Sequence, residues 1–482
     1  YIICFFNSII TIFEIIGIGI FFPIIVIFID KDRLYEFVDS YIFLSFINDF
    51  KYESILAISL SLLILFYIIK SIVIILINYY KAKIFFKLIA ELSLKVFKTY
   101  LNQNLSFYIK SNSAQITRSI IDHSNNYVHH ALTGVFNVIF EIVLILLIIV
   151  FLFQINVLIS LIIFSLLFTF MVIFFILNKK SLRQYGNSLN LRYTYRLKVI
   201  REMIDGIKEI NLYDKSNFYE KIFSDHNNKI SSLTAALSLK DILPKNLIEP
   251  LAVLIIASVI GYLVFDGNST KEILPLLAII GIAFVKISPS IGKILSSLQR
   301  IRQSEPYVKE LNIIFDNYRN IEINKNVQFN LSNINFKDVS FSYDKELIFE
   351  KINFSIKKNT IFGIKGLSGS GKTTLVNLLL GFLKPQNGKI LVDNTSIYQN
   401  LKKWQENIGY VPQKVFIADG TLEDNIAFGE DKEKIDKNHI NKVFVMSKLE
   451  KSFANLNVRV GELGNKISAG QIQRIGIARA LY

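Results

Sequence analysis

The sequence has little of the cysteine that stabilises small secreted domains and little of the charge that covers the surface of soluble proteins. Its 482 residues include one cysteine, Cys4, which excludes a framework of disulfide bonds. Proline occurs 8 times, and charged residues make up 19% of the chain, against roughly 25% in soluble globular domains. Apolar residues reach 52%, which excludes a disordered chain and a collagen-like fibre. This composition is that of a membrane protein with a soluble part.

Apolar stretches long enough to cross a bilayer as helices, which takes roughly 20 residues, occur six times. They are residues 2–29, 54–78, 131–153, 155–177, 247–265 and 273–295. Such a run does not recur after Leu295, where the pattern becomes that of a globular domain. We therefore predict an all-α transmembrane domain at 1–319 whose helices extend into the cytoplasm. A linker at 320–333 and a globular α/β domain at 334–482 would follow.

The basic residues predict the orientation of these spans. The chain carries 54 Lys and Arg against 39 Asp and Glu, a net charge of +15 that by itself suits a nucleic-acid binder. However, these residues gather in the long loops 79–130 and 178–246, whereas the first loop, 30–53, is mainly acidic. By the positive-inside rule, the two long loops and the C-terminal domain are cytoplasmic. We expect a multi-pass protein of a bacterial inner membrane, in contact with lipid and not with nucleic acid.

A glycine-rich loop marks a phosphate site in the C-terminal domain. Residues 366–374 read Gly-Leu-Ser-Gly-Ser-Gly-Lys-Thr-Thr, a G-x-x-x-x-G-K-[ST] motif between a strand-like run at 361–365 and a helical run at 375–380. Glycines let successive N–H groups surround a phosphate, and the helix N-terminus adds its positive dipole end. The residues predicted to bind ATP here are Gly366, Ser368, Gly369, Ser370, Gly371, Lys372, Thr373 and Thr374. Lys372 is expected at the β- and γ-phosphates, and the Thr373 hydroxyl at Mg²⁺.

Further motifs occur in a fixed order around this loop. Tyr343 ends a strand-like run before the loop, and Gln413 follows a second strand-like run, Ile-Gly-Tyr-Val-Pro at 408–412, after it. Residues 467–471 read Ile-Ser-Ala-Gly-Gln and precede a helical segment. With six spans before them, these motifs make the chain resemble, over essentially its whole length, an exporter-type half-transporter of the ATP-binding-cassette (ABC) family.

The resemblance implies roles for these residues. Tyr343 stacks on adenine, and Gln413, the one catalytic residue predicted here, reaches Mg²⁺ and the attacking water. Ser468, Gly470 and Gln471 face the ATP bound by a second copy, so a dimer, expected to be a homodimer, is required. The family signature usually reads Leu-Ser-Gly-Gly-Gln, and the extra methyl group of Ala469 is expected to slow closure of the paired domains.

The same resemblance suggests that the chain is a fragment. It begins at Tyr1 inside a span, and the family's Walker B aspartate, catalytic glutamate and switch histidine would follow Tyr482. We expect the 482-residue polypeptide itself to hydrolyse ATP poorly.

The sixth span and its continuation narrow the subfamily. Residues 284–302 resemble the sixth-span motif of bacterial lipid-linked oligosaccharide flippases. This implies alternating access driven by ATP, with a lipid-linked saccharide as cargo. Ionisable groups at membrane depth are costly and tend to face a pathway. The residues expected to hold an anionic head group are Lys70, Lys286, Lys293 and Arg302.

Alternatives to this reading remain open. Lys70 lies near the inner headgroups and can equally be a snorkelling residue. Glu14 and Glu141 are intramembrane carboxylates with either a packing or a ligand role. The cargo can also be a peptide, a drug or lipid A, and a regulator that binds ATP without transporting anything has the same motifs.

Overall fold

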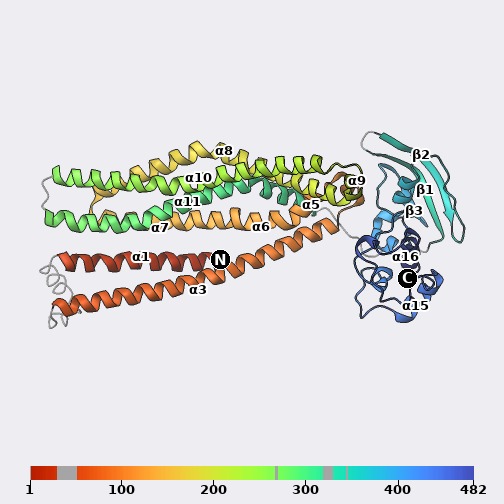
Figure 1. Ribbon diagram of the computed structural model, residues 1–482, viewed down its shortest axis with the longest axis horizontal. Coiled ribbons are helices and arrows are strands. Elements are labelled where there is room, and N and C mark those ends of the chain that lie inside the picture. The colour runs from red at the N-terminus through yellow and green to blue at the C-terminus, as the bar shows by residue number, and fades with distance from the viewer. Residues whose placement is uncertain (1, 30–51, 266–269, 319–328, 330, 344–345) are drawn as a thin grey trace. The chain divides into compact units, whose positions relative to one another are not determined.

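The computed structural model describes residues 2–29, 52–265, 270–318, 329, 331–343 and 346–482. It divides into two compact units, one of Tyr1–Gln103 with Lys110–Asn320 and the other of Asn104–Ile109 with Ile321–Tyr482 (Figure 1). The acidic first loop and most of the predicted linker at 320–333 lie outside the described residues. The predicted fold class is confirmed, because a helical unit precedes an α/β unit with a small sheet.

Among its described residues, the first unit has six helices long and apolar enough to cross a membrane. They are α1 (Ile2–Ile29), α3 (Tyr52–Leu101), α7 (Thr133–Ile155), α8 (Val157–Asp205), α10 (Ser216–Phe265) and α11 (Thr270–Tyr318). Helices α3 and α10 have 50 residues each, about 75 Å at 1.5 Å per residue. Since the hydrocarbon core is about 30 Å thick, these helices continue far beyond the lipid.

One residue separates α7 from α8. Asn156 has extended backbone angles (φ −154°, ψ 114°), which ends α7 after Ile155. Its side-chain oxygen accepts a hydrogen bond of 3.0 Å from the Ile159 N–H, so the same residue is the N-cap of α8. The two helices pack with α1, α10 and α11 around a core of buried apolar residues that includes Ile18, Ile148, Ile163, Ile255 and Ile287.

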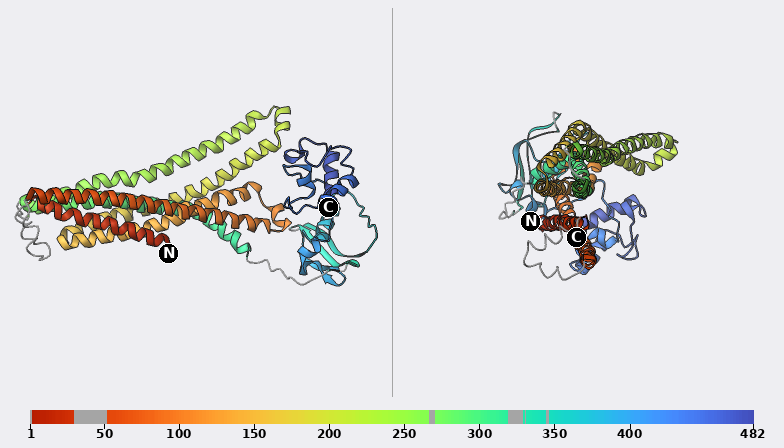
Figure 2. Two further views of the ribbon diagram at one scale, coloured as in Figure 1. Left: turned by 90° about the horizontal axis from the view of Figure 1, so that it is seen from below. Right: turned by 90° about the vertical axis from the view of Figure 1, so that its left-hand side faces the viewer.

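A long helical hairpin forms the cytoplasmic part of α8 and α10. Gly206 interrupts α8 and leads into the short helix α9 (Ile207–Leu212), after which α10 returns antiparallel to α8. The Lys240 Nζ donates a hydrogen bond of 3.0 Å to the Asn178 Oδ1, which joins the two helices near the membrane. Towards α9 the hairpin stands apart from the other helices (Figure 2).

The segment before α7 is helical but irregular. Short α-helices, α4 (Leu105–Lys110), α5 (Ser113–Arg118) and α6 (Ser124–Asn126), alternate with wider π-helical turns, η2 (Ser119–His123) and η3 (Tyr127–Leu132). The Arg118 side chain is 2% exposed and donates to the Asn190 carbonyl and, at 2.7 Å, to the Thr194 Oγ1. A buried arginine therefore fixes this segment against α8.

The second unit contains a four-stranded antiparallel sheet of order β2-β1-β3-β4. The strands are β1 (Asn333–Tyr343), β2 (Glu346–Lys357), β3 (Asn387–Val392) and β4 (Thr395–Ser396), and α12 (Lys372–Leu379) packs on them around Phe336, Leu378 and Trp404. The strands expected at 361–365 and 408–412 are absent, and this prediction was wrong. In the described chain neither run has a neighbouring strand to supply ladder hydrogen bonds.

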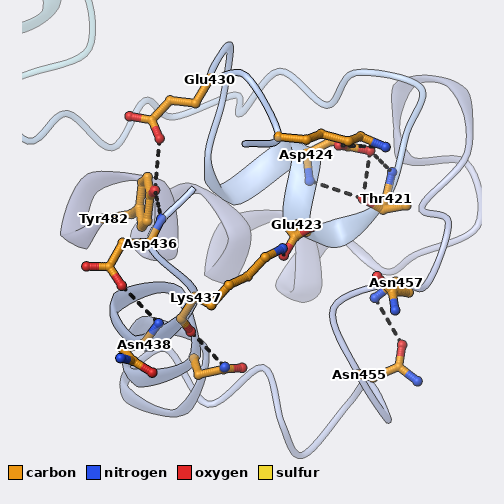
Figure 3. Close-up of polar contacts among 12 residues, drawn as sticks. Thr421, Glu423, Asp424, Glu430, Asp436, Lys437, Asn438, Asn455, Asn457 and Tyr482 are labelled. Atoms are coloured by element: carbon orange, nitrogen blue, oxygen red, sulfur yellow. Dashed lines mark hydrogen bonds and ion pairs between the residues drawn. The ribbon is translucent and has the colours of Figure 1, made fainter. Parts of the chain in front are cut away.

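Short helices form the other half of this unit around a second core, which includes Leu422, Ile440, Val460 and Ile475. They are α14 (Leu422–Ile426), α15 (Lys437–Met446), η5 (Glu462–Gly464) and α16 (Ala469–Leu481), whereas η4 (Ile397–Gln399) and α13 (Leu401–Gln405) pack on the first core. Polar contacts fix their ends (Figure 3). Thr421 and Asp424 form a reciprocal cap of α14, and the Lys437 Nζ lies 2.6 Å from the Glu423 Oε1, which joins α15 to α14.

Candidate nucleotide site and membrane cavity

The glycine-rich loop has the backbone that phosphate binding requires. Gly369 (φ +83°) and Gly371 (φ +86°) lie in the left-handed region, and Gly371 is the N-cap of α12. Residues 361–370 are exposed, so the loop is open to a ligand. The N-terminus of α12 therefore points its unpaired N–H groups and its positive dipole end at this loop. Gly366, Ser368 and Ser370 lie in the same loop, as the sequence predicts.

Lys372 lies where a phosphate ligand is expected. Its Nζ donates to the carbonyl groups of Gly366 (2.9 Å) and Leu367 (2.6 Å), so the ammonium group is folded back over the loop. Thr373 is exposed beside it, whereas Thr374, the next residue of α12, is buried. The exposed hydroxyl of this pair is thus that of Thr373, the residue that the sequence predicts at Mg²⁺. Both threonines had been predicted as nucleotide-binding residues.

Tyr343 and Gln413 lie on different parts of the second unit, one on a strand and the other in an irregular segment. Tyr343 is the last residue of β1 and packs edge-on against Phe341, with ring centroids 5.0 Å apart. Gln413 is exposed in an irregular segment, and its carbonyl accepts a hydrogen bond of 2.7 Å from the Gln473 Nε2 on α16. The segment around Gln413 is thus tied to the helix that follows Ser468.

Ser468 begins that helix with a capping box. Its Oγ accepts a hydrogen bond of 3.3 Å from the Gln471 N–H, and the Gln471 Oε1 accepts one of 2.7 Å from the Ser468 N–H. Ser468, Ala469 and Gly470 are exposed at the helix start. The Gln471 side chain is therefore occupied within its own chain, and the exposed groups at this end are those of Ser468 and Gly470.

The membrane-spanning unit contains a polar cavity of about 470 Å³ between α1, α3, α7 and α11. Six charged side chains line it: Glu14, Lys81, Glu141, Lys286, Lys293 and Arg300. Four of these are cations and two are carboxylates, which leaves a surplus of two positive charges. Among the described residues, no carboxylate lies within ion-pair distance of Lys81 or Arg300.

Ion pairs connect three of the four predicted substrate residues to carboxylates. Lys70 and Lys286 both bind the Glu14 Oε2, at 2.8 and 2.6 Å, and the Lys293 Nζ lies 2.8 Å from the Glu141 Oε1. Lys286 and Lys293 line the cavity, and Lys70 reaches it through Glu14. The structure thus brings these three lysines to one region.

The fourth predicted residue, Arg302, lies elsewhere. It lines a separate hollow with Lys180, Arg183, Gln184 and Asn187 on the cytoplasmic part of α8. Arg300 is the arginine that lines the cavity, and the sequence analysis missed it together with Lys81. Helical spacing could have found Arg300, because it follows Lys293 by seven residues and therefore shares its helix face.

The fold and these motifs define a polytopic membrane protein with a P-loop nucleotide-binding unit. Two family models agree with this class. The model of the ABC transporter transmembrane region matches residues 1–287, and the model described as ABC transporter matches residues 349–482. The chain belongs to the ABC transporter family. It is a multi-pass membrane protein whose ATP-binding unit is cytoplasmic.

The chain is similar to proteins named as export proteins and as a flippase. A putative export ATP-binding/permease protein of Rickettsia conorii is 39% identical over 156 residues, which are 31% of this chain and 27% of that protein. An ATP-dependent lipid A-core flippase of Ralstonia nicotianae is 23% identical over 421 residues, 84% of this chain and 70% of that protein. The chain spans less than a third of the length of the Rickettsia relatives it matches.

A solved structure shares the fold. The structure of a bacterial Atm1-family ABC exporter with ATP bound superposes with a TM-score of 0.77 at 17% identity, over 99% of this chain and 82% of that one. At this identity the likeness concerns the fold.

Proposed function

We propose that this chain acts in the bacterial inner membrane as half of a homodimeric exporter driven by ATP and Mg²⁺. ATP binds the loop from Gly366 to Thr374 and Tyr343 stacks on its adenine. Thr373 and Gln413 hold the Mg²⁺, which would neutralise phosphate charge when bound. Closure of the paired units on ATP, followed by hydrolysis, drives alternating access in the spans.

The need for a second copy is supported by the position of the signature residues. Helix α12, which follows the glycine-rich loop, packs on the core around Phe336 and Leu378, whereas Ser468 caps a helix of the other core, around Ile440 and Ile475. The exposed Ser468 hydroxyl and the exposed Gly470 N–H group, at the start of α16, are available to complete a nucleotide site on another copy. The hairpin tip at α9 is a further surface for that copy.

We further propose that the cargo is a lipid with an anionic head group, in particular a lipid-linked saccharide. The cationic surplus of the cavity carries this proposal. Lys81 lies 29 residues into α3, about 44 Å along the helix and thus near the cytoplasmic membrane surface. The cavity therefore extends from membrane depth at Glu14 towards the inner leaflet, where a lipid can enter head group first. Lys70, Lys286 and Lys293 are the ligands proposed at membrane depth, and Arg302 guides entry from its cytoplasmic hollow.

Replacing Lys286 tests the cargo proposal. The Lys286→Ala variant of the reconstituted transporter is expected to lose most of the ATPase stimulation by an anionic glycolipid, because the head group loses a cation at the cavity wall. Lys309→Ala, which removes an exposed lysine on the cytoplasmic end of α11, is the control and is expected to retain stimulation. Equal stimulation of wild type and Lys286→Ala would exclude Lys286 from the site. Stimulation by peptides or neutral drugs alone would contradict the anionic cargo.

A further inference from the structure

Two ammonium groups in the membrane-spanning unit share one carboxylate oxygen. The Glu14 Oε2 on α1 accepts from the Lys286 Nζ of α11 at 2.6 Å and from the Lys70 Nζ of α3 at 2.8 Å. The Lys70 side chain is 5% exposed, whereas Glu14 and Lys286 are partly exposed to the cavity. A single oxygen position thus has two cationic donors from two different helices, and it faces a space of about 470 Å³.

The surroundings hold the Lys70 ammonium group in place. A Cβ on Gly17 would lie 3.2 Å from the Lys70 Nζ and 3.3 Å from the Tyr67 hydroxyl, so α1 approaches these two side-chain ends closely here. The Lys70 Nζ also lies 5.0 Å from the centroid of the Tyr67 ring. Because Lys70 is packed in this way, the two lysines form a preformed receptor for an oxyanion.

The charges around this receptor do not balance. Two lysines against one carboxylate leave one positive charge at membrane depth, where unpaired charge is costly. Lys81 and Arg300 add two further cations to the same cavity. The region is therefore prepared for more negative charge than Glu14 supplies.

We propose that Glu14 is a built-in competitor of the cargo. Its carboxylate occupies the position that the phosphate or carboxylate group of the cargo takes between Lys70 and Lys286. This inference rests on the proposed transport of an anionic lipid and adds the residue that limits its affinity. When the acid group of the cargo takes over the two lysines, Glu14 loses the ion pairs that hold α1 to α3 and α11. Cargo binding thereby releases α1, which couples occupancy of the cavity to a change in the helix bundle.

The chain contains a matched control for this role. Glu141 lines the same cavity, but it pairs with Lys293 alone, and the Lys293 side chain is 63% exposed. Removing the charge of Glu141 makes the cavity more positive by one unit, as removing that of Glu14 does, without opening a two-lysine position. The comparison of Glu14→Gln with Glu141→Gln therefore separates the receptor from its general electrostatic background.

Equilibrium binding of dodecyl phosphate to the protein in phosphatidylcholine nanodiscs tests the inference. Glu14→Gln is expected to bind this probe about tenfold more tightly than wild type, within the usual range of coupling between competing ligands. Dodecylphosphocholine, which is zwitterionic, is expected to bind both proteins equally, and Glu141→Gln to change either affinity less than threefold (about 0.6 kcal/mol). Adding Lys70→Met and Lys286→Met to Glu14→Gln is expected to abolish the gain.

Several results would overturn the inference. Unchanged or weaker binding of dodecyl phosphate by Glu14→Gln would show that Glu14 positions the lysines and does not compete. If Glu141→Gln gained as much affinity for dodecyl phosphate, the effect would come from the general positive charge of the cavity and not from the two-lysine position. Absence of binding to wild type and to every variant would refute the anionic cargo and the competitor together. If inorganic phosphate binds as tightly as dodecyl phosphate, the competitor role holds and the lipid cargo is refuted.

A measurement on wild type avoids any folding defect of the variants. Cys4 is exposed on α1 and is the only cysteine of the sequence, so a spin label there reports the motion of this helix. Dodecyl phosphate is expected to increase the mobility of the label, and dodecylphosphocholine to leave it unchanged. A label equally immobile with both would contradict the release of α1.

Discussion

At the scale of single residues, two glycines of the nucleotide loop share a backbone conformation but not an environment. Gly369 and Gly371 both have left-handed φ angles. A Cβ on Gly371 would lie 2.7 Å from the Phe349 ring and 2.8 Å from the Ile348 Cγ2, whereas nothing lies within 4 Å of one on Gly369. The two positions therefore separate backbone strain from steric exclusion.

Alanine at these positions is expected to weaken ATP binding to different degrees. Left-handed backbone costs an L-residue about 1–2 kcal/mol, so Gly369→Ala is expected to weaken binding about 5- to 30-fold. Gly371→Ala adds an overpacking cost of about 1–3 kcal/mol and is expected to weaken binding about 30-fold or more. Titration with a fluorescent ATP analogue measures both. Equal losses of affinity in the two variants would show that the close contact of Gly371 with β2 contributes nothing to ATP binding.

The sequence reveals the nucleotide loop but not the membrane cavity, and the reason lies in how far apart the residues are. Gly366 to Thr374 are consecutive, so their chemistry is visible as a motif. Glu14 lies 56 residues from Lys70 and 272 residues from Lys286, and only packing of three helices brings them together. The sequence analysis expects Arg302 at the cargo site, but Arg300 is the arginine that lines the cavity. Residues two apart on a helix point in directions that differ by about 200°, so the two arginines face different surroundings.

At the scale of elements, the sequence predicts where a helix ends better than it predicts where a strand forms. Asn156 separates α7 from α8 close to the boundary expected between the spans 131–153 and 155–177. The runs at 361–365 and 408–412 have strand-like residues, but a strand also needs a partner, and sequence pattern does not show one. Turn chemistry is local and therefore clearer: Asp393 (φ +48°) and Asn394 (φ +73°) form the two-residue turn between β3 and β4.

Asp393 makes the stability of the sheet depend on pH. Its carboxylate accepts from the backbone N–H groups of Ser332 and Asn333 (2.9–3.1 Å), which hold the pKa of Asp393 below its ordinary value of 3.8. A lowered pKa stabilises the folded state above pH 3.8, and this contribution is lost as the pH falls through the lower folded value. The sheet is therefore expected to lose stability below about pH 4, as these N–H groups lose their charged acceptor.

Fluorescence of Trp404 checks this expectation, because this sole tryptophan is buried in the core beneath the sheet. Asp393→Asn retains a residue that tolerates the left-handed turn and removes the charge. The variant is expected to unfold a few degrees below wild type at pH 7, with a difference that disappears towards pH 3. A constant difference across this range would assign the effect to packing.

At the scale of the whole molecule, the hairpin of α8, α9 and α10 presents apolar side chains at its tip. Leu212 is 76% exposed, and Ile207, Tyr213 and Phe218 are also exposed, on a part of the chain that stands apart from the other helices (Figure 2). Amphipathic periodicity predicts that such residues are covered, but it does not identify the surface that covers them. We expect this surface to belong to a second copy, in keeping with the proposed dimer.

Replacing Leu212 tests whether the tip contributes to pairing. Full burial of a leucine contributes about 1.5–3 kcal/mol, so Leu212→Ser is expected to weaken association of copies about 10- to 100-fold. Lys208→Ser on the same short helix removes an exposed polar side chain and is expected to leave association nearly unchanged. Energy transfer between donor- and acceptor-labelled copies in nanodiscs, measured with and without ATP, gives both dissociation constants. If Leu212→Ser pairs as tightly as wild type in both states, the apolar tip is not part of the contact between copies, and the pairing must depend on the nucleotide-binding units and the spans.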